Sequence, residues 1–321
     1  MYVLELAGED DNFAAAEAQN AAEDVHVIAP GLATAKSIAT SRISNLAYTH
    51  RVSAVLSQTS SSLPDLFNSI DNIQISPSGT IAVRARNVRK STHIDTKQIE
   101  RDIGTMFVDK GFPVDLTNPL HEIRVLFSDN ICIVGRLVRT SSKSYVNRNP
   151  TKKPFFQPGS MDSVEARAIA NLAGAGPNTI LFDPMCGTGG ILIEAALMGA
   201  TVYGMDIQNK MAAGSNENLQ YYSSTDFMIL QGDAANFPIS TKIDAILFDI
   251  PYGRQSKIAG YELDVLVNHT LVEAAQITSN VIVISDSFLG DLIQQTDWNL
   301  RRHFTRRVHK SLTRYIHILY K

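Results

Sequence analysis

The C-terminal half of this chain predicts a doubly wound α/β sheet, and the N-terminal half predicts a smaller α+β module. Two observations predict the sheet: short apolar strands alternate with helices after residue 163, and four of these strands end in an aspartate. A third observation separates the halves, because residues 141–157 combine prolines, small polar residues and basic residues as linkers do. The 321 residues suffice for two or three domains, and we expect them to fold without help from a metal or a disulfide.

The first part of the chain, residues 1–65, predicts a small N-terminal domain of short strands and helices. Its expected elements are strands over 2–6, 25–29 and 52–58 and helices over 11–22 and 41–49. No residue of this part indicates catalysis.

Residues 66–140 predict a second α+β domain. Its expected elements are a helix over 63–70, a strand over 79–88, a helix from Asp95 to Gly111 and strands over 121–127 and 131–138. Asp95 is a typical N-cap and Gly111 a typical stop for the longer helix. Arg84 and Arg86 lie two residues apart on a strand and therefore point to one face.

The last part, residues 158–321, predicts the doubly wound domain. Its expected helices cover 163–172, 191–198 and 271–277, and its expected strands cover 179–182, 201–205, 227–230, 243–248, 281–285 and 315–319. Because ligands bind at the carboxyl ends of the strands in such sheets, we expect the functional site at that edge.

Charge patterning favours a nucleic-acid partner in spite of the net charge of −3. Local basic patches rather than net charge set binding to phosphate. Most of the Lys and Arg residues lie in three short stretches: Arg84, Arg86, Arg89 and Lys90; Arg139, Lys143, Arg148, Lys152 and Lys153; and Arg301, Arg302, Arg306, Arg307, Lys310, Arg314 and Lys321. Each stretch alone could equally be a solvated face.

The cysteine count and the hydropathy pattern bound the location of the protein. Cys132 and Cys186 are far apart and in no metal-binding spacing, so we expect a reduced, cytoplasmic protein without a structural zinc. No stretch approaches the ~20 apolar residues that a membrane span needs. We also expect a monomer.

A glycine-rich loop over 183–190, Asp-Pro-Met-Cys-Gly-Thr-Gly-Gly, lies between a predicted strand and a predicted helix. Glycines there allow a ligand to approach the backbone closely. No Gly-Lys-Ser/Thr follows, and Leu192 replaces the third glycine of the dinucleotide fingerprint. Asp183 would repel a pyrophosphate, so the loop suits a ligand with a cationic amino-acid end.

The sequence Asp249-Ile250-Pro251-Tyr252 follows the buried strand over 243–248. An acid, a rigid proline and an aromatic ring at a sheet edge can hold a flat, amino-bearing ring by hydrogen bonds at its rim and by stacking on its face. A nucleobase is the obvious candidate for that ring.

These motifs together resemble a known family. The loop over 183–190 resembles motif I of class I S-adenosylmethionine-dependent methyltransferases, which have a Rossmann-like fold. Asp249-Ile250-Pro251-Tyr252 resembles the [Asp/Asn]-x-Pro-[Tyr/Phe] motif of enzymes that methylate exocyclic amino groups, with Ile250 where a second proline is usual. The segment 154–161, with Gln157 where His is expected, resembles the segment that precedes this domain in tRNA guanine N2-methyltransferases. The tail 309–316 resembles the ending of the archaeal enzymes that methylate guanosine-10 of tRNA. The layout of residues 1–140 resembles a ferredoxin-like domain followed by a THUMP domain.

The resemblance implies roles for individual residues. S-adenosylmethionine would be bound by Asp183, Cys186, Gly187, Gly189, Asp206, Ile207, Asp233, Ala234 and Asp249, with Asp206 on the ribose and Asp233 near the adenine. Asp249, Pro251 and Tyr252 would act on the guanine amino group, with the Ile250 carbonyl as a further acceptor. The tRNA phosphates would contact Arg84, Arg86, Arg148 and Lys152, and no metal is implied.

Two alternatives to methylation of the N2 amino group of guanosine-10 stay open. The tetrapeptide also fits an enzyme that acts on an adenine or cytosine amino group in DNA or ribosomal RNA. A non-catalytic RNA-binding protein with a residual cofactor fold is the second alternative. The tail and the N-terminal module argue against the first, and the joint presence of donor and acceptor motifs argues against the second. The implied product carries one methyl group or two.

Overall fold

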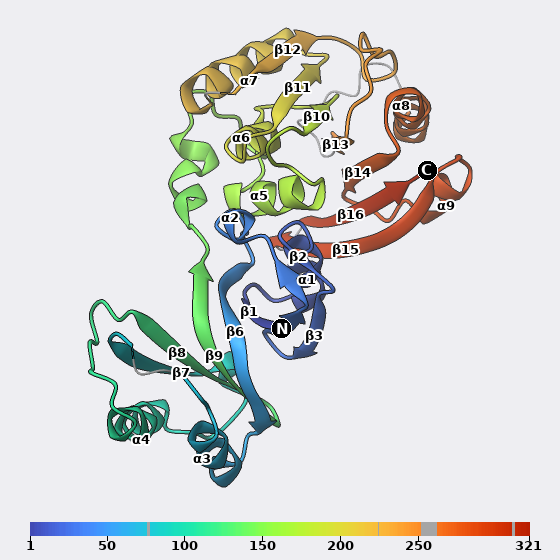
Figure 1. The fold of residues 1–321 in the computed structure, drawn as a ribbon. Helices are drawn as coiled ribbons and strands as arrows, with labels where there is room; N and C mark the ends of the chain where they lie inside the picture. Colours follow the sequence, from blue (N-terminus) through green and yellow to red (C-terminus); the bar gives the residue numbers. More distant parts are fainter. Residues whose placement is uncertain (76–77, 224, 252–261, 310–311) are drawn as a thin grey trace. The chain divides into compact units, whose positions relative to one another are not determined.

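The computed structural model describes residues 1–75, 78–223, 225–251, 262–309 and 312–321. They form two compact units, Met1–Ser142 and Lys143–Lys321, each with its own seven-stranded sheet (Figure 1). The mixed α/β architecture predicted from the sequence is confirmed. Among the described helices, none has the length and apolar character that crossing a membrane requires.

One sheet runs through the whole first unit, in the order β3-β4-β1-β6-β9-β8-β7. Its strands are β1 (Tyr2–Leu6), β3 (His26–Ala29), β4 (Leu32–Ala35), β6 (Thr49–Ser60), β7 (Ile81–Asn87), β8 (His121–Ser128) and β9 (Ile131–Thr140), and β2 (Ala22–Glu23) pairs with β5 (Ser37–Ile38) apart from it. The helices are α1 (Asp11–Ala18), α2 (Thr40–Ile43), α3 (Leu63–Asp71), the 3-10 helix η1 (Val88–Lys90) and α4 (Thr96–Asp109). Because β6 pairs with both β1 and β9, the sheet continues across the predicted boundary at residue 65, and a division into two domains there stays a prediction.

Helix α4 confirms the sequence reasoning in detail. The Asp95 side chain accepts the backbone N–H groups of Lys97 and Gln98 at 3.0 and 3.2 Å, which caps the helix. Ile99, Ile103 and Phe107 are buried in the core between the helices and β7, β8 and β9. Further on, Gly111 has φ +91°, the left-handed conformation expected after a helix end.

Two predicted helices of the first unit were too long. The helix expected over 11–22 ends at Ala18, and Ala22 pairs with Ile38 instead. The helix expected over 41–49 covers only 40–43, because Thr49 pairs with Leu6 in the sheet. In both places strand pairing with distant residues overrides local helix propensity.

The second unit holds the predicted doubly wound sheet, in the order β12-β11-β10-β13-β14-β16-β15. Its strands are β10 (Ile180–Asp183), β11 (Thr201–Asp206), β12 (Phe227–Gln231), β13 (Ala245–Asp249), β14 (Asn280–Ser285), β15 (Asn299–His309) and β16 (Leu312–Tyr320). Its helices are the 3-10 helices η2 (Ser144–Arg148) and η3 (Pro150–Lys152), then α5 (Ser163–Leu172), α6 (Gly190–Ala196), α7 (Asn209–Tyr222), α8 (Leu263–Ile277) and α9 (Gly290–Gln294). Helices α8 and α9 lie on one side of the sheet, and α5 and α6 lie on the other (Figure 1).

The five strands β10 to β14 are parallel, and the β15–β16 hairpin adds antiparallel strands at one edge. Parallel pairing brings the carboxyl ends of β10, β11 and β13 together, and this positions the site. The core on the α8 side includes Phe182, Phe248, Leu271 and Trp298.

Most of the segment expected as a linker packs on the second unit. Tyr145 is buried, and its carbonyl accepts the Ser163 hydroxyl at 2.8 Å. Arg148 forms two hydrogen bonds to the Glu194 carboxylate, at 2.7 and 2.8 Å. Residues 143–157 therefore form part of the fold that holds the site.

Candidate active site

Four aspartates follow four neighbouring strands at one edge of the second sheet. Asp183, Asp206 and Asp249 are the last residues of β10, β11 and β13, and Asp233 lies two residues beyond β12. Since β11 and β13 both pair with β10 in parallel, their carboxyl ends are adjacent. This is the convergence that the sequence predicted.

The glycine loop after β10 is fixed by its neighbours on β11. The Gly187 N–H donates to Asp206 Oδ2 at 3.0 Å, and the Cys186 N–H donates to the Met205 carbonyl at 2.9 Å. Gly187 and Gly189 have φ of +53° and +74°, which side chains disfavour. A Cβ on Gly189 would also collide with the Ser215 hydroxyl, whereas a Cβ on Gly187 would enter open space. The loop thus leaves an open surface beside Asp206.

Burial alters the pKa values of the acids at this edge, and for Asp183 the closeness of other acids adds to the effect. Burial raises the pKa of Asp183 well above its ordinary value, and the nearby charges of Asp206 and Asp249 raise it further against the N–H of Met185. Burial also raises the pKa of Asp206, although the N–H groups of Gln208 and Gly187 oppose the shift. Burial, followed by the charges of Asp183 and Asp206, raises the pKa of the Cys186 thiol. A cationic ligand would relieve this repulsion.

Two further predicted cofactor positions flank the acids. Ile207 is 38% exposed directly after Asp206, and Ala234 is buried directly after Asp233. Asp233 Oδ1 accepts the Ala235 N–H at 2.9 Å, which shapes the turn after β12. Among the described residues, no cluster of acids, histidines and cysteines could hold a metal ion.

Segment 153–160 lies against the glycine loop, and Asn218 of α7 fastens it there. The Asn218 side chain accepts the Phe155 N–H and donates to the carbonyls of Phe155 and Thr188, each at 2.9 Å. The hydroxyls of Ser160 and Thr188 lie 3.2 Å apart. Sequence reasoning missed Asn218, because an asparagine inside a helix carries no signal of a bond to a segment 63 residues away.

The predicted acceptor residues lie at the end of β13. Asp249 is partly buried, and its Oδ2 lies 3.5 Å from the Nε of Arg314 on β16. The Ile250 N–H donates to the Ile284 carbonyl at 2.9 Å, and its side chain is buried, so β14 fixes the backbone before the half-buried Pro251. Tyr252 lies outside the described residues.

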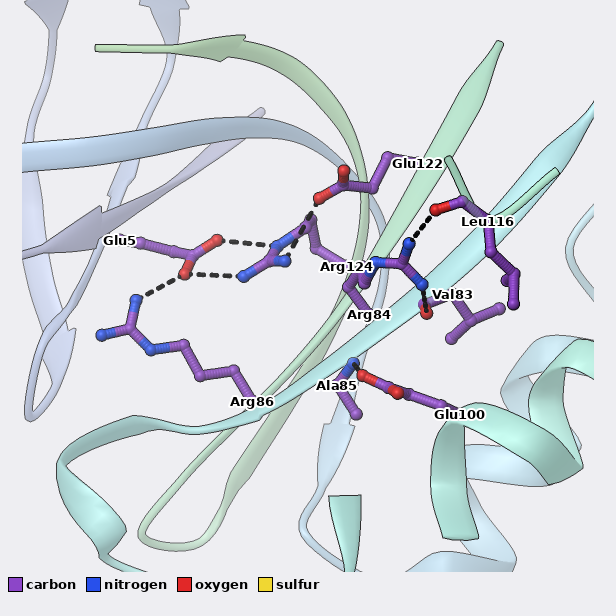
Figure 2. A network of polar contacts seen from close by, with 9 residues as sticks. All are labelled: Glu5, Val83, Arg84, Ala85, Arg86, Glu100, Leu116, Glu122 and Arg124. Carbon is purple, nitrogen blue, oxygen red and sulfur yellow. Dashed lines mark hydrogen bonds and ion pairs between the residues drawn. The ribbon is translucent and has the colours of Figure 1, made fainter. Parts of the chain in front are cut away.

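The four predicted phosphate contacts have different surroundings. Arg86 forms an ion pair with Glu5 at 2.8 Å, and Arg84 donates to the carbonyls of Val83 and Leu116, as Figure 2 shows. Arg148 is largely buried against Glu194, which gives it a structural role besides the predicted one. Lys152 is exposed.

A family described as "RMKL-like, methyltransferase domain" matches residues 150–316, and the THUMP domain matches residues 61–136. The sheet order, the glycine loop and these matches define a methyltransferase joined to a THUMP domain. The tRNA (guanine(10)-N2)-dimethyltransferase of Methanothermobacter thermautotrophicus is 36% identical over 282 residues, which cover 85% of this chain and 83% of that protein. This chain therefore belongs to the family of tRNA (guanine(10)-N2)-methyltransferases.

Solved structures agree on the fold. TrmN from Thermus thermophilus has a TM-score of 0.52 at 21% identity, covering 100% of this chain and 99% of that one. SMU.472, a structure complexed with SAH, has a TM-score of 0.51 at 14% identity and covers 99% of this chain and 97% of that one. Both similarities concern the fold alone.

Proposed function

We propose that this protein transfers a methyl group from S-adenosylmethionine to the N2 amino group of guanosine-10 in tRNA. The observation that carries the proposal is that Asp249 ends the strand beside Asp183. Donor-side and acceptor-side acids thus share one sheet edge, as transfer between two bound molecules requires.

The residues at the edge fit a nucleoside with a cationic amino-acid end. Asp206 Oδ1 and Oδ2 each accept one backbone N–H, and a carboxylate with about four lone-pair sites can still accept the two ribose hydroxyls. The open space at Gly187 admits the ligand next to that carboxylate. Burial raises the pKa of Asp183, and binding of the cationic amino-acid end beside it would favour the ionised carboxylate. When bound, the cofactor supplies an electrophilic methyl group on a sulfonium centre.

The chain's own residues would prepare the acceptor. A guanine N2 group is a poor nucleophile while its lone pair is delocalised into the ring, so its two N–H bonds must be held out of plane. The Asp249 carboxylate and the Ile250 carbonyl are the proposed acceptors of those N–H bonds, with Tyr252 stacked on the base. Asp249 would orient the amine and stabilise the positive charge that forms on nitrogen as the methyl group leaves the sulfonium, and the proton that the nitrogen then loses passes to solvent. The base must first leave its helix, because the amino group is unreachable inside a duplex.

We propose that tRNA is bound by the first unit and by the residues at the start of the second. The THUMP match covers β7, which carries Arg84 and Arg86, together with β8 and most of β9. Lys152 is exposed and can meet a phosphate. We expect the protein to act in the cytoplasm as a monomer.

The decisive experiment incubates the purified protein with labelled cofactor and unmodified tRNA and maps the product by nuclease digestion and mass spectrometry. Label on N2 of guanosine-10 is the expected result, and the mass distinguishes one methyl group from two. Asp249→Ala should reduce the single-turnover rate, measured with saturating cofactor and tRNA, by ~10² or more. Label on adenine or cytosine would overturn the substrate, and a full-rate Asp249→Ala enzyme would overturn the mechanism.

A further inference from the structure

Arg314 is a buried cation within reach of the acid that ends β13. It lies on β16 and is 2% exposed. Its Nη1 donates to Glu165 Oε2 of α5 at 2.6 Å, and its Nε lies 3.5 Å from Asp249 Oδ2. One guanidinium thus contacts two carboxylates from different elements, one of which is the proposed acceptor acid.

We propose that Arg314 is a positioning residue for methyl transfer: it holds the Asp249 carboxylate in the orientation that receives the amino group, and Glu165 holds Arg314. The inference rests on the proposed function of Asp249. On this proposal Arg314 acts through Asp249 and not by contact with the substrate.

Strand pairing and a helix cap fix the elements that carry these side chains. Ile284 of β14 pairs with Asp249 on one side and with Ile316 on the other, so the register of three strands fixes the distance between β13 and β16. Glu165 lies in the first turn of α5, which Asp162 caps by accepting the Val164 N–H at 2.8 Å. A planar guanidinium between two fixed backbones leaves the Asp249 side chain little freedom to rotate.

The charge balance of the three side chains supports the same role. A buried arginine alone beside Asp249 would neutralise the acid and weaken its attraction for the positive charge that forms on the amine. Glu165 adds a second negative charge, so the group of Glu165, Arg314 and Asp249 carries a net charge of −1. Arg314 can therefore orient Asp249 while the site keeps its negative field.

A purely structural role is the competing explanation, because a buried ion pair between β16 and α5 also ties a helix to the sheet. The molecule offers a matched control. Arg167 of α5 is also buried and pairs with a buried glutamate, with its Nη2 2.7 Å from Glu194 Oε2. Loss of either arginine removes a buried ion pair, and Arg314 is the one whose guanidinium pairs with Asp249 as well.

The test compares Arg314→Met, Arg314→Lys and Arg167→Met in the full-length protein, by single-turnover methylation below the melting temperature of every variant. Arg314→Met should lower the rate constant about 10- to 100-fold with saturating tRNA, because a misplaced acid loses alignment. Its cofactor and tRNA affinities should stay within about twofold of the original, because on this proposal Arg314 acts only through the orientation of Asp249. Arg314→Lys should recover part of the rate, and Arg167→Met should lose stability without losing rate.

A double substitution tests whether Arg314 acts through Asp249. In Asp249→Asn protein, adding Arg314→Met should cause little further loss, because the carboxylate that Arg314 orients is already gone. Equal rate losses in Arg314→Met and Arg167→Met, or additive losses with Asp249→Asn, would overturn the positioning role.

A crystal structure of Arg314→Met supplies a readout that needs no activity: the Asp249 side chain should change its rotamer, and an unchanged rotamer would contradict the proposal. Product mapping on the original protein is done first. If its label lies on another base, the substrate proposal fails, and the same variants are compared on that RNA.

Discussion

The Gly187 N–H donates to the Asp206 carboxylate at 3.0 Å, so the loop after β10 and the end of β11 form one unit. Asp206 thereby has two tasks, to shape the loop and to accept the ribose hydroxyls. We expect Asp206→Ala to cost ~1.5 to 3 kcal/mol of cofactor binding, or about 10- to 150-fold in affinity. Calorimetric titration measures it, and unchanged affinity would refute the assignment of the ribose site.

The buried Asp183 carboxyl predicts a conflict between function and stability. Its pKa is raised in the folded protein, first by burial and then by Asp206 and Asp249. A raised folded-state pKa gives a contribution to stability that is complete below the ordinary carboxyl pKa and is lost as the pH rises through the folded value. Asp183→Asn should therefore raise the melting temperature of the ligand-free protein, and the increase should be larger at pH 8 than at pH 5.

The same substitution, Asp183→Asn, should weaken cofactor binding although it raises the melting temperature. The amide that replaces the Asp183 carboxylate would keep an oxygen for the Met185 N–H but would lose the charge that a cationic ligand needs. Scanning calorimetry of both proteins at the two pH values, with and without cofactor, checks the pair of effects. A melting temperature that Asp183→Asn lowers equally at both pH values would contradict the linkage.

Glu5 connects β1 to β7 and β8 through two arginines. It is 1% exposed, and its carboxylate binds Arg124 at 2.9 and 3.0 Å and Arg86 at 2.8 Å (Figure 2). Glu5→Ala would leave the buried Arg124 without its bidentate partner, at an expected cost of about 3 to 5 kcal/mol of unfolding free energy.

The matched control is a second glutamate that contacts the same arginine, Arg124. Glu122 contacts Arg124 at 3.2 Å but is 25% exposed in its side chain, so Glu122→Gln should cost under about 1 kcal/mol. Urea unfolding of the two variants gives the comparison, and equal costs would show that burial of Glu5 does not set its contribution.

The sequence predicted the sheet of the second unit because its strands are short, apolar and followed by acids. It missed β15, where adjacent arginine pairs separate single apolar residues and only Phe304 is buried. Helix α7 was also missed, since its mixed polar composition gives a weak helical pattern. Elements at a sheet edge or on the surface carry little apolar periodicity, and their placement depends on pairing with distant strands.

The residues of the candidate site likewise divide into those that the sequence could place and those that it could not. Asp183, Asp206 and Asp249 could be placed from the sequence, because the end of a parallel strand fixes where its last residue lies. The partners of those acids could not: Asn218 and Arg314 reach the site across 63 and 65 residues from Phe155 and Asp249, respectively. No local pattern encodes a contact of that separation.

Lys152 and Arg148 should differ in their effect on tRNA binding. Lys152 is exposed, so Lys152→Ala should lower the slope of log affinity against log salt by about 0.7 to 0.9, as loss of one phosphate contact does. Arg148→Met should chiefly lower the melting temperature, because its guanidinium binds Glu194. Filter binding at several salt concentrations separates the two, and an unchanged slope for Lys152→Ala would remove that residue from the proposed interface.

We expect the second unit to bind the cofactor and the first unit to supply most of the affinity for tRNA. Fragments of the chain can test this, and the residue at which a fragment begins affects the result. Residues 143–321 form a compact unit, so this fragment should bind cofactor with the affinity of the whole chain and lose most of its affinity for tRNA.

A fragment of residues 158–321 should behave differently, because it lacks Phe155, which Asn218 holds against the glycine loop, and Arg148, which binds Glu194. We expect it to melt at a lower temperature and to bind cofactor more weakly, since the loop loses the segment that packs on it. Calorimetry measures cofactor affinity for both fragments, and filter binding measures tRNA affinity. Full tRNA affinity in the 143–321 fragment would refute the division of work, whereas equal cofactor affinity in the two fragments would show that segment 143–157 contributes nothing to the donor site.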